Sequence, residues 1–250
     1  MTDIEPAANT GLSRRLFSSN ALKLIAMACM VCDHYSVAFI SPKMTLLRWI
    51  GRISFPVFAF LIAEGAAKTR NVHRYMLRLL LFAFISEIPF DLMDAGVLFA
   101  PDYQNVYFTL TAGLLSIRAF QLLQRKGGFY PVLSVFPLLL ITLGCEFLQT
   151  DYSTGGALAI FLFYIAGQCK ENRPLRLLLL LAAILAPCIY YSHLYETLRW
   201  NWNEIGALFA LPLLLLYNGE RGKAKINKYL FYAFYPAHLL LFGVIKLLLQ

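Results

Sequence analysis

Long apolar runs alternate along the chain with short segments rich in charge, proline and glycine. A transmembrane helix needs roughly 20 mostly apolar residues to cross a hydrocarbon core about 30 Å thick, and the chain has room for about nine. The expected spans are Ala21–Ile40, Leu47–Ala67, Tyr75–Leu92, Val106–Leu123, Tyr130–Phe147, Gly155–Gln168, Leu175–Tyr191, Ile205–Tyr217 and Tyr229–Leu249. No repeat or linker divides the chain. We therefore expect one all-α polytopic membrane bundle over residues 1–250, with residues 1–20 as a polar cytoplasmic segment.

The basic residues separate onto one side of the expected spans. Cytoplasmic loops of membrane proteins carry an excess of Lys and Arg. With the N-terminus inside and the C-terminus outside, only five of the 22 basic residues fall outside, namely Lys43, Arg48, Arg52, Arg199 and Lys246. Acidic residues gather on that outer side, namely Asp91, Asp94, Asp102, Glu146, Asp151, Glu196 and Glu204. A missed span would exchange the sides of all later loops, so the segregation favours an odd number of spans.

The composition excludes a soluble domain. Hydrophobic residues make up 59% of the chain and charged residues 14%, against about 45–50% and about 25% in soluble proteins. The net charge of +8 does not indicate nucleic-acid binding, because the basic residues are spread between apolar segments. The five cysteines lie in or beside apolar runs and are expected to be buried thiols. Cys29 and Cys32 form a CxxC, which is a weak zinc or redox signal without a second pair.

Asp33 and His34 lie in the outer half of the first expected span, and Arg52 lies at a similar depth in the second. Ionisable groups at this depth are costly, usually face a bundle interior or a cavity, and by default mark function. Neighbouring helix positions point about 100° apart, so Asp33 and His34 are expected to contact different partners. The alternative is a polar clasp between helices. Arg52 either extends to the outer surface or holds a carboxylate, a phosphate or a developing oxyanion.

Two later spans carry further ionisable groups. Glu87 and Asp91 are four residues apart on the outer half of the third expected span, where they serve either to neutralise Arg52 or to take part in catalysis. His238 lies near the middle of the last span. It is expected either to form a hydrogen bond between helices or to belong to the site.

The cytoplasmic end of the third expected span is basic. Arg70, Arg74 and Arg78 follow each other at intervals of four, which predicts a ladder on one helix face. Glu64, at the inner end of the second span, is expected to pair with Lys68 one turn later. The ladder suits either anionic lipid headgroups or a phosphorylated cytosolic ligand.

Six segments, taken together and in this order, resemble the TraX family. The resemblance runs from about Leu22 to the last span. The segments are LKLIAMACMVCDHY, GRISFPVFAFLIAEGAAKTRNVHRYMLRLL, FISEIPFDL, DYSTGGAL, LLLLYNGERG and KYLFYAFYPAHLLLF. The namesake of the family acetylates F-type pilin. The family is in turn similar to transmembrane acyltransferases, which use cytosolic acetyl-CoA to acetylate acceptors reached from the opposite face.

The resemblance implies catalytic or donor-binding roles for residues in these segments. Asp33 and His34 are implied to be catalytic. The other motif residues implied to belong to the site are Arg52, Glu64, Glu87 and His238. Nothing in the sequence indicates a pilus or conjugation system, which leaves the acceptor open.

We therefore expect an acetyltransferase in the bacterial cytoplasmic membrane that moves an acetyl group from cytosolic acetyl-CoA to an extracytoplasmic peptide N-terminus or cell-surface glycan hydroxyl. His34 would act as general base or as acyl carrier, and Arg52 would stabilise the oxyanion. This chemistry needs no metal. The arginine ladder, with Lys68 and Lys23, would receive the 3′-phospho-ADP part of CoA. Glu64 is implied to be an active-site or donor-binding residue.

Two other hypotheses stay open. A proton-coupled transporter could use Asp33, His34 and Glu87 as a relay, although the chain has no inverted repeats of the kind that many carriers have. A membrane scaffold would carry its intramembrane charges at a cost and without a function. Membrane lipids are expected partners in every case, and both a monomer and a homo-oligomer fit the sequence.

Overall fold

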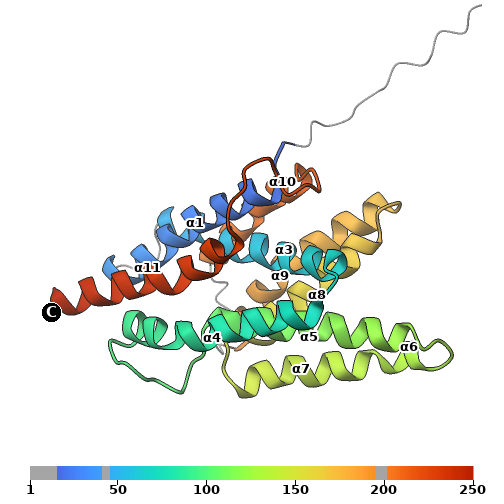
Figure 1. The fold of residues 1–250 in the computed structure, drawn as a ribbon, viewed down its shortest axis with the longest axis horizontal. Helices are drawn as coiled ribbons and strands as arrows, with labels where there is room; N and C mark the ends of the chain where they lie inside the picture. The colour runs from blue at the N-terminus through green and yellow to red at the C-terminus, as the bar shows by residue number, and fades with distance from the viewer. Residues whose placement is uncertain (1–15, 41–45, 195–201, 250) are drawn as a thin grey trace, which may run out of the picture.

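The computed structural model of the chain describes residues 16–40, 46–194 and 202–249. This part of the chain is helical (Figure 1) and has no β-strand beyond isolated bridges. Its elements are α1 Ser19–Phe39, α2 Leu46–Gly51, α3 Ser54–Lys68, α4 Val72–Asp94, α5 Val106–Gln124, α6 Tyr130–Leu133, α7 Val135–Phe147, α8 Ser153–Gln168, α9 Arg173–Leu194, the 3-10 helix η1 Trp202–Phe209, α10 Ala210–Leu215 and α11 Lys228–Leu248. Among the residues named above to assign sides, Lys43, Glu196 and Arg199 lie outside the described ranges, as does most of the polar N-terminal segment.

The prediction of an all-α fold is confirmed, and each expected span coincides with helix. Within the described residues, five segments are long and apolar enough to cross a membrane, namely Ser19–Phe39, Leu46–Lys68, Val106–Gln124, Arg173–Tyr190 and Lys228–Leu248. Val135–Phe147, Ser153–Gln168 and Glu204–Leu215 are shorter apolar helices. Helix α4 has 23 residues but carries several charges. The number of nine spans and their orientation therefore stay predictions.

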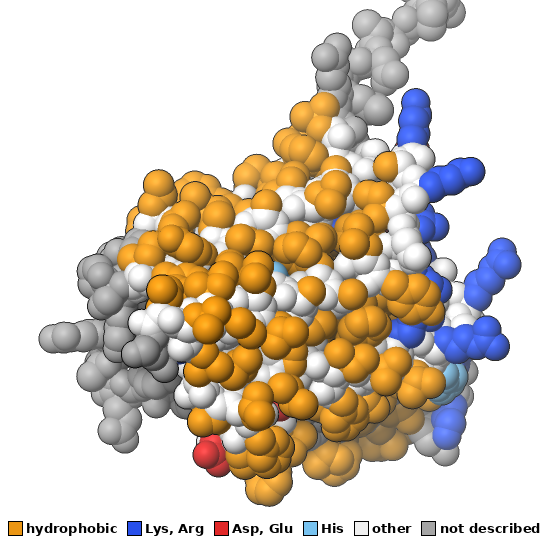
Figure 2. All heavy atoms as spheres, turned by 60° about the vertical axis from the view of Figure 1, so that its left-hand side comes forward, with side chains coloured by type: hydrophobic (Ala, Val, Ile, Leu, Met, Phe, Trp, Pro, Cys, Tyr) orange, Lys and Arg blue, Asp and Glu red, His pale blue; other side chains and the backbone are white. Residues whose placement is uncertain are grey.

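Helix α3 forms the centre of the bundle. It packs against α1, α5, α8, α10 and η1, while α4 pairs with α11 and α8 pairs with α9 (Figure 1). Val57 and Ala59 in α3 are fully buried. Large apolar side chains that face outward, such as Phe84 and Ile88 of α4, are more than half exposed. Figure 2 shows one broad face covered by hydrophobic side chains, with Lys and Arg side chains gathered along one edge. Such a surface fits a lipid environment bounded by a basic rim.

The second expected span is interrupted. Helix α2 ends at Gly51 and α3 begins at Ser54, so Arg52 lies in a turn between two helices. Two glycines allow the close packing of α2. A Cβ added at Gly51 would lie 2.3 Å from the Cβ of Asp33, and one added at Gly206 would lie 2.3 Å from the carbonyl oxygen of Trp49. These contacts bring α1, α2 and η1 together around the arginine.

The segment before α1 is tied to the loop before α11. The backbone N–H groups of Leu16 and Phe17 donate to the carbonyl of Leu216, and the N–H of Ser19 donates to the carbonyl of Glu220. The Asn20 side chain donates to the carbonyl of Ala224. The loop that follows Tyr217 is therefore held against the first turn of α1.

Candidate active site

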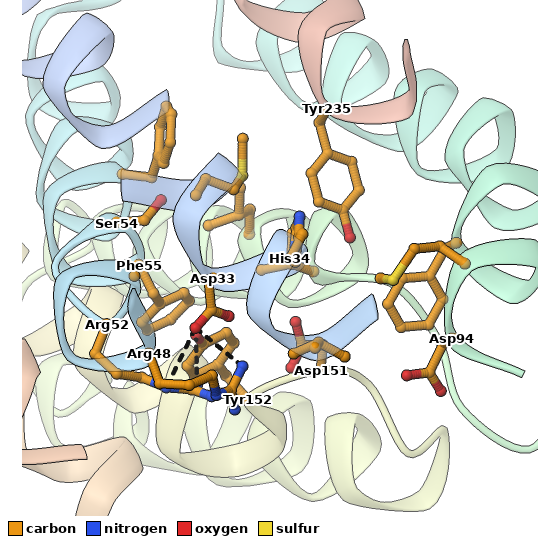
Figure 3. Close-up of a pocket in the computed structure, with 18 of the residues that line it drawn as sticks. Asp33, His34, Arg48, Arg52, Ser54, Phe55, Asp94, Asp151, Tyr152 and Tyr235 are labelled. Carbon is orange, nitrogen blue, oxygen red and sulfur yellow. Dashed lines mark hydrogen bonds and ion pairs between the residues drawn. The ribbon is translucent and has the colours of Figure 1, made fainter. Parts of the chain in front are cut away.

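A cavity of about 580 Å³ lies at the C-terminal end of α1 and is lined by ionisable side chains from several elements. The residues that give it chemical character are Asp33, His34, Arg48, Arg52, Asp151 and Glu204. Figure 3 shows Asp33 directed at Arg48 and Arg52, whereas His34, the next residue of α1, projects in another direction. We call this space the outer cavity.

His34 and His238 form a direct hydrogen bond between α1 and α11. Nδ1 of His34 lies 2.6 Å from Nε2 of His238. The ring planes differ by 13° and the centroids are 4.9 Å apart, which fits a bond in the plane of both rings. Nδ1 of His238 lies 2.8 Å from the carbonyl oxygen of Phe234. His34 lines the outer cavity. His238 is not among the lining residues and contacts His34 from α11.

These distances determine the tautomer of the neutral pair. A carbonyl only accepts hydrogen bonds, so Nδ1 of His238 donates to Phe234 and its Nε2 must accept. Nδ1 of His34 then donates to His238. This leaves Nε2 of His34 without a proton, with its lone pair available for a proton or an acyl group.

Arg52 is held by carboxylates from two other elements. Its Nε is 3.3 Å from Oε1 of Glu204 and 3.9 Å from Oδ1 of Asp33. Its Nη1 donates to the hydroxyl of Tyr152 at 3.1 Å. Asp33 also forms an ion pair with Arg48, whose Nη1 lies 2.9 Å from Oδ1 of Asp33. Buried charges need such partners because desolvation is costly.

The turn before α8 completes the wall of the outer cavity. Tyr152 stacks on Phe55, with centroids 3.8 Å apart and planes 8° apart. Tyr152 and Ser153 have φ angles of 62° and 38°, a left-handed conformation that is strained for residues with a Cβ. Asp151 accepts a hydrogen bond from Tyr103 at 2.9 Å. Burial raises the pKa of Asp151 to about 6, and the bond from Tyr103 partly opposes this rise.

A second cavity of about 520 Å³, the inner cavity, lies at the opposite end of the same helices. It is strongly basic, and its cations come from α1, α3, α4, the loop after α10, and α11. They are Lys23, Lys68, Arg78, Arg221 and Lys228. Tyr75, Phe231 and Tyr232 add aromatic walls. Nζ of Lys23 lies 4.9 Å from the ring centroid of Phe231, and the guanidinium of Arg78 lies 5.7 Å from that of Tyr75.

Glu64 is the acidic member of the inner cavity, and its pairing with Lys68 is confirmed. Nζ of Lys68 lies 2.7 Å from Oε1 of Glu64 and donates to the carbonyl of Gly219 at 2.6 Å. The hydroxyl of Tyr217 donates to Oε2 of Glu64 at 2.6 Å. Glu64 therefore holds the loop after Tyr217 against α3.

The structure brings together most of the residues that the sequence singled out. Asp33, His34 and Arg52 line the outer cavity, and His238 binds His34. Glu64, Lys68 and Arg78 line the inner cavity. The expectation that Asp33 and His34 contact different partners is confirmed.

Of the two alternatives for Glu87, neutralisation of Arg52 is wrong. Glu87 accepts hydrogen bonds from the backbone and side chain of Asn105, at the start of α5. Asp91 accepts from the backbone N–H of Ala100. Glu87 is not among the described residues that line either cavity, so no relay of Asp33, His34 and Glu87 is assembled there.

The expected arginine ladder is only partly present. Helix α4 begins at Val72, because Asn71 caps it by accepting from the N–H of Arg74. Arg70 therefore precedes the helix and does not share its face. Arg70 and Arg74 are exposed, and only Arg78 reaches the inner cavity.

Sequence reasoning missed several residues of the two cavities. In the outer cavity these are Arg48, Tyr103, Asp151, Tyr152, Glu204 and Tyr235, and in the inner cavity Arg221 and Lys228. The DYSTGGAL segment contained the signal for Asp151 and Tyr152. All five cysteines are free, and the described residues contain no group of three or more His, Cys, Asp or Glu side chains placed to hold a metal ion.

Comparison with known proteins gives the family. The family model described as TraX protein matches residues 18–246. The chain is 30% identical over 255 residues to the "Probable fimbrial assembly protein FimC, serogroup H1" of Dichelobacter nodosus, covering 96% of this chain and all of that protein. No solved structure matches. The chain therefore belongs to the TraX family.

Proposed function

We propose that this protein is an integral membrane acetyltransferase that takes an acetyl group from acetyl-CoA bound in the inner cavity and gives it to an acceptor in the outer cavity. The observation that carries the proposal is the His34–His238 bond, which leaves Nε2 as the unprotonated nitrogen of a histidine that lines a cavity with two arginines. The TraX family is associated with pilin acetylation, which agrees with this chemistry.

His34 acts as the base in the simplest form of the reaction. The acceptor attacks in its neutral form, so a peptide ammonium first releases one proton to solvent. Nε2 of His34 then takes a proton from the acceptor nitrogen or oxygen as that atom attacks the thioester carbonyl. A bond forms between the acceptor and the acetyl carbon, the carbon–sulfur bond breaks, and the proton passes to the leaving thiolate of CoA. Alternatively, Nε2 attacks first and carries the acetyl group as an acyl-imidazole. Arg48 and Arg52 supply the positive charge that stabilises the oxyanion in either path.

The inner cavity suits the 3′-phospho-ADP part of CoA. The cations that line it can neutralise the phosphate charges, and Arg78 and Arg221 can form bidentate hydrogen bonds to phosphate oxygens. The rings of Tyr75, Phe231 and Tyr232 offer flat surfaces for adenine. Arg70 and Arg74, exposed beside the bundle, are better suited to anionic lipid headgroups.

The charge of the outer cavity favours an amine as acceptor. Its lining contains Asp33, Asp94, Asp151 and Glu204 against only Arg48 and Arg52. The arginines already bind Asp33 and Glu204. Asp94 and Asp151 therefore give the cavity a negative surplus that attracts a cation. We infer that a peptide N-terminus binds here in preference to a glycan hydroxyl, and a fimbrial subunit would provide such a terminus.

The pH dependence of acceptor use is expected to follow Asp151. Its pKa of about 6 means that the carboxylate is present above pH 6 and lost below it. The KM for an amine acceptor should therefore rise as the pH falls below 6, by about tenfold per pH unit. Steady-state kinetics between pH 5 and 8 would measure this. Asp151→Asn should raise the KM at neutral pH and flatten the acid limb, and an unchanged acid limb would exclude Asp151 as the anchor.

The proposal is tested by labelled acetyl-CoA and by binding. Membranes that contain the protein should transfer the label to a peptide N-terminus, and saturation with acetyl-CoA at one hundred times Kd should stabilise the purified protein by about 2.7 kcal/mol. Arg78→Ala combined with Arg221→Ala should weaken CoA binding at least tenfold. Arg70→Ala combined with Arg74→Ala is the matched control, and its Kd should stay near that of the wild type.

Two results would contradict the proposal. A protein that shows neither label transfer nor stabilisation by acetyl-CoA is not an acetyl-CoA-dependent enzyme, and a proton-coupled carrier would then be the better hypothesis. Equal loss of affinity in the two arginine double variants would move the donor from the inner cavity to the exposed surface of α4.

A further inference from the structure

The inner and outer cavities meet at two side chains. Phe58 of α3 and Leu110 of α5 line both cavities. On α3, Ser54 lines only the outer cavity and Leu61 only the inner one. Ser54, Phe58 and Leu61 follow one another at spacings of four and three residues, so they share one helix face. Phe58 and Leu110 together therefore separate the two spaces, with Phe58 at the midpoint of that face.

The burial of α3 supports this picture. Val57 and Ala59, on either side of Phe58, have no exposed surface, whereas Phe58 is partly exposed although it lies in the middle of the bundle. Its ring therefore borders open space. Leu110 on the opposite side is 6% exposed. The barrier between the basic inner cavity and the histidine of the outer cavity is apolar and about one side chain thick.

We propose that Phe58 and Leu110 form the constriction through which the pantetheine arm of acetyl-CoA passes from the inner to the outer cavity. This inference rests on the proposed function. The headgroup of CoA stays among the cations of the inner cavity, and the slender arm displaces the Phe58 ring to bring the thioester to Nε2 of His34. When no arm is bound, the two side chains close the route to water and ions.

The constriction sets a requirement on the donor. A donor needs a long thin arm that ends in a thioester, and a headgroup that binds at the inner end. A short donor such as acetyl phosphate can bind the basic cavity through its phosphate, but its acetyl group cannot reach His34. Phe58 and Leu110 thereby determine which activated acetyl compounds react.

The passage itself is tested without reference to activity. Ser54→Cys places a thiol in the outer cavity, and a charged, membrane-impermeant methanethiosulfonate is added to one face of sealed proteoliposomes at a time. Mass spectrometry of the peptide that contains position 54 reports labelling apart from the native cysteines. With Phe58 intact, labelling from the inner-cavity face should be at least tenfold slower than from the outer face. Phe58→Ala and Leu110→Ala should each raise the inner-face rate at least tenfold.

Phe60→Ala is the matched control. Phe60 lies two residues away on α3, is 9% exposed, and packs on Phe163 and Tyr217 rather than on a cavity. Like Phe58→Ala, the Phe60→Ala substitution removes a phenylalanine ring from α3. It should leave the labelling rate of Cys at position 54 unchanged. Equal acceleration by Phe60→Ala and Phe58→Ala would overturn the constriction, as would an unchanged inner-face rate in both Phe58→Ala and Leu110→Ala.

A second measurement tests whether the pantetheine arm uses this route. Phe58→Trp should lower acetyl transfer from acetyl-CoA at least tenfold while leaving the Kd for adenosine 3′,5′-bisphosphate, a probe of the headgroup alone, near the wild-type value. Unchanged turnover in Phe58→Trp would overturn the passage of the arm. Failure of the wild type to bind the bisphosphate would instead refute the donor site, and the labelling experiment would still decide whether the constriction exists.

Discussion

Replacement of His34 by alanine is expected to lower the rate of acetyl transfer by about 10²–10⁴-fold, the usual contribution of a general base. The hydrogen bonds from His34 to His238 and from His238 to the carbonyl of Phe234 leave Nε2 as the proton acceptor of His34, which lines the outer cavity. Alanine removes that acceptor and leaves His238, which does not line the cavity, too far back to replace it. The loss should appear in kcat, because the inner cavity, where we propose that the donor binds, is unchanged.

His73→Ala is the matched control for this experiment. His73 lies in the first turn of α4, is exposed, and lines neither cavity. Its loss should leave turnover unchanged. Transfer of labelled acetyl by membranes with equal amounts of each variant would measure the difference. Turnover retained by His34→Ala would remove His34 from the mechanism and would leave the arrangement of the two histidines as a structural clasp.

His238 takes the position that a carboxylate holds in many catalytic triads. In those sites an acidic side chain accepts the hydrogen bond from Nδ1 of the histidine and sets its tautomer. Here a neutral imidazole does so, and its own proton is held by a backbone carbonyl of the same helix. Asp33 does not fill this role, because it points toward Arg48 (Figure 3). A neutral partner avoids a further buried charge at a point where the arginine network already contains several.

The helices and much of the site were predictable because they depend on local properties. Apolar runs long enough to span a bilayer must form helices to satisfy their backbone hydrogen bonds. The 100° step between helix neighbours correctly separated the partners of Asp33 and His34. The pairing of Glu64 with Lys68 followed from a spacing of four residues on one helix.

The remaining contacts depend on how helices are rotated against one another, which hydropathy does not encode. Glu87 has the depth to meet Arg52, but α4 packs against α5 and α11, and Glu87 turns to Asn105. The helix break at Arg52 lies within an apolar run, so hydropathy did not reveal it. The partners of Arg52, Tyr152 and Glu204, come from segments about 100 and 150 residues away. Long-range pairs of this kind require the folded structure.

Loss of the Arg52 side chain is expected to have the largest effect on stability. Arg52 is 11% exposed and Glu204 5% exposed, and removal of one member of a buried ion pair typically costs about 3–5 kcal/mol, because the other charge remains buried without its partner. Arg52→Met keeps most of the apolar volume of the side chain. It should clearly lower the melting temperature of the protein purified in detergent. Glu204→Gln added to Arg52→Met should restore part of the loss.

The exposed pair of Lys68 and Glu64 provides the comparison. Nζ of Lys68 is as close to its carboxylate as a buried pair would be, at 2.7 Å, but the Lys68 side chain is 57% exposed. Exposed pairs contribute about 0–1 kcal/mol, so Lys68→Met should change the melting temperature little. If Arg52→Met is no more destabilising than Lys68→Met, the outer cavity is open to water and Arg52 is solvated there. The electrostatic stabilisation of an oxyanion would then be weak, because it depends on the exclusion of water from the site. The stability of one ion pair therefore tests whether the outer cavity provides the dry environment that acetyl transfer at His34 requires.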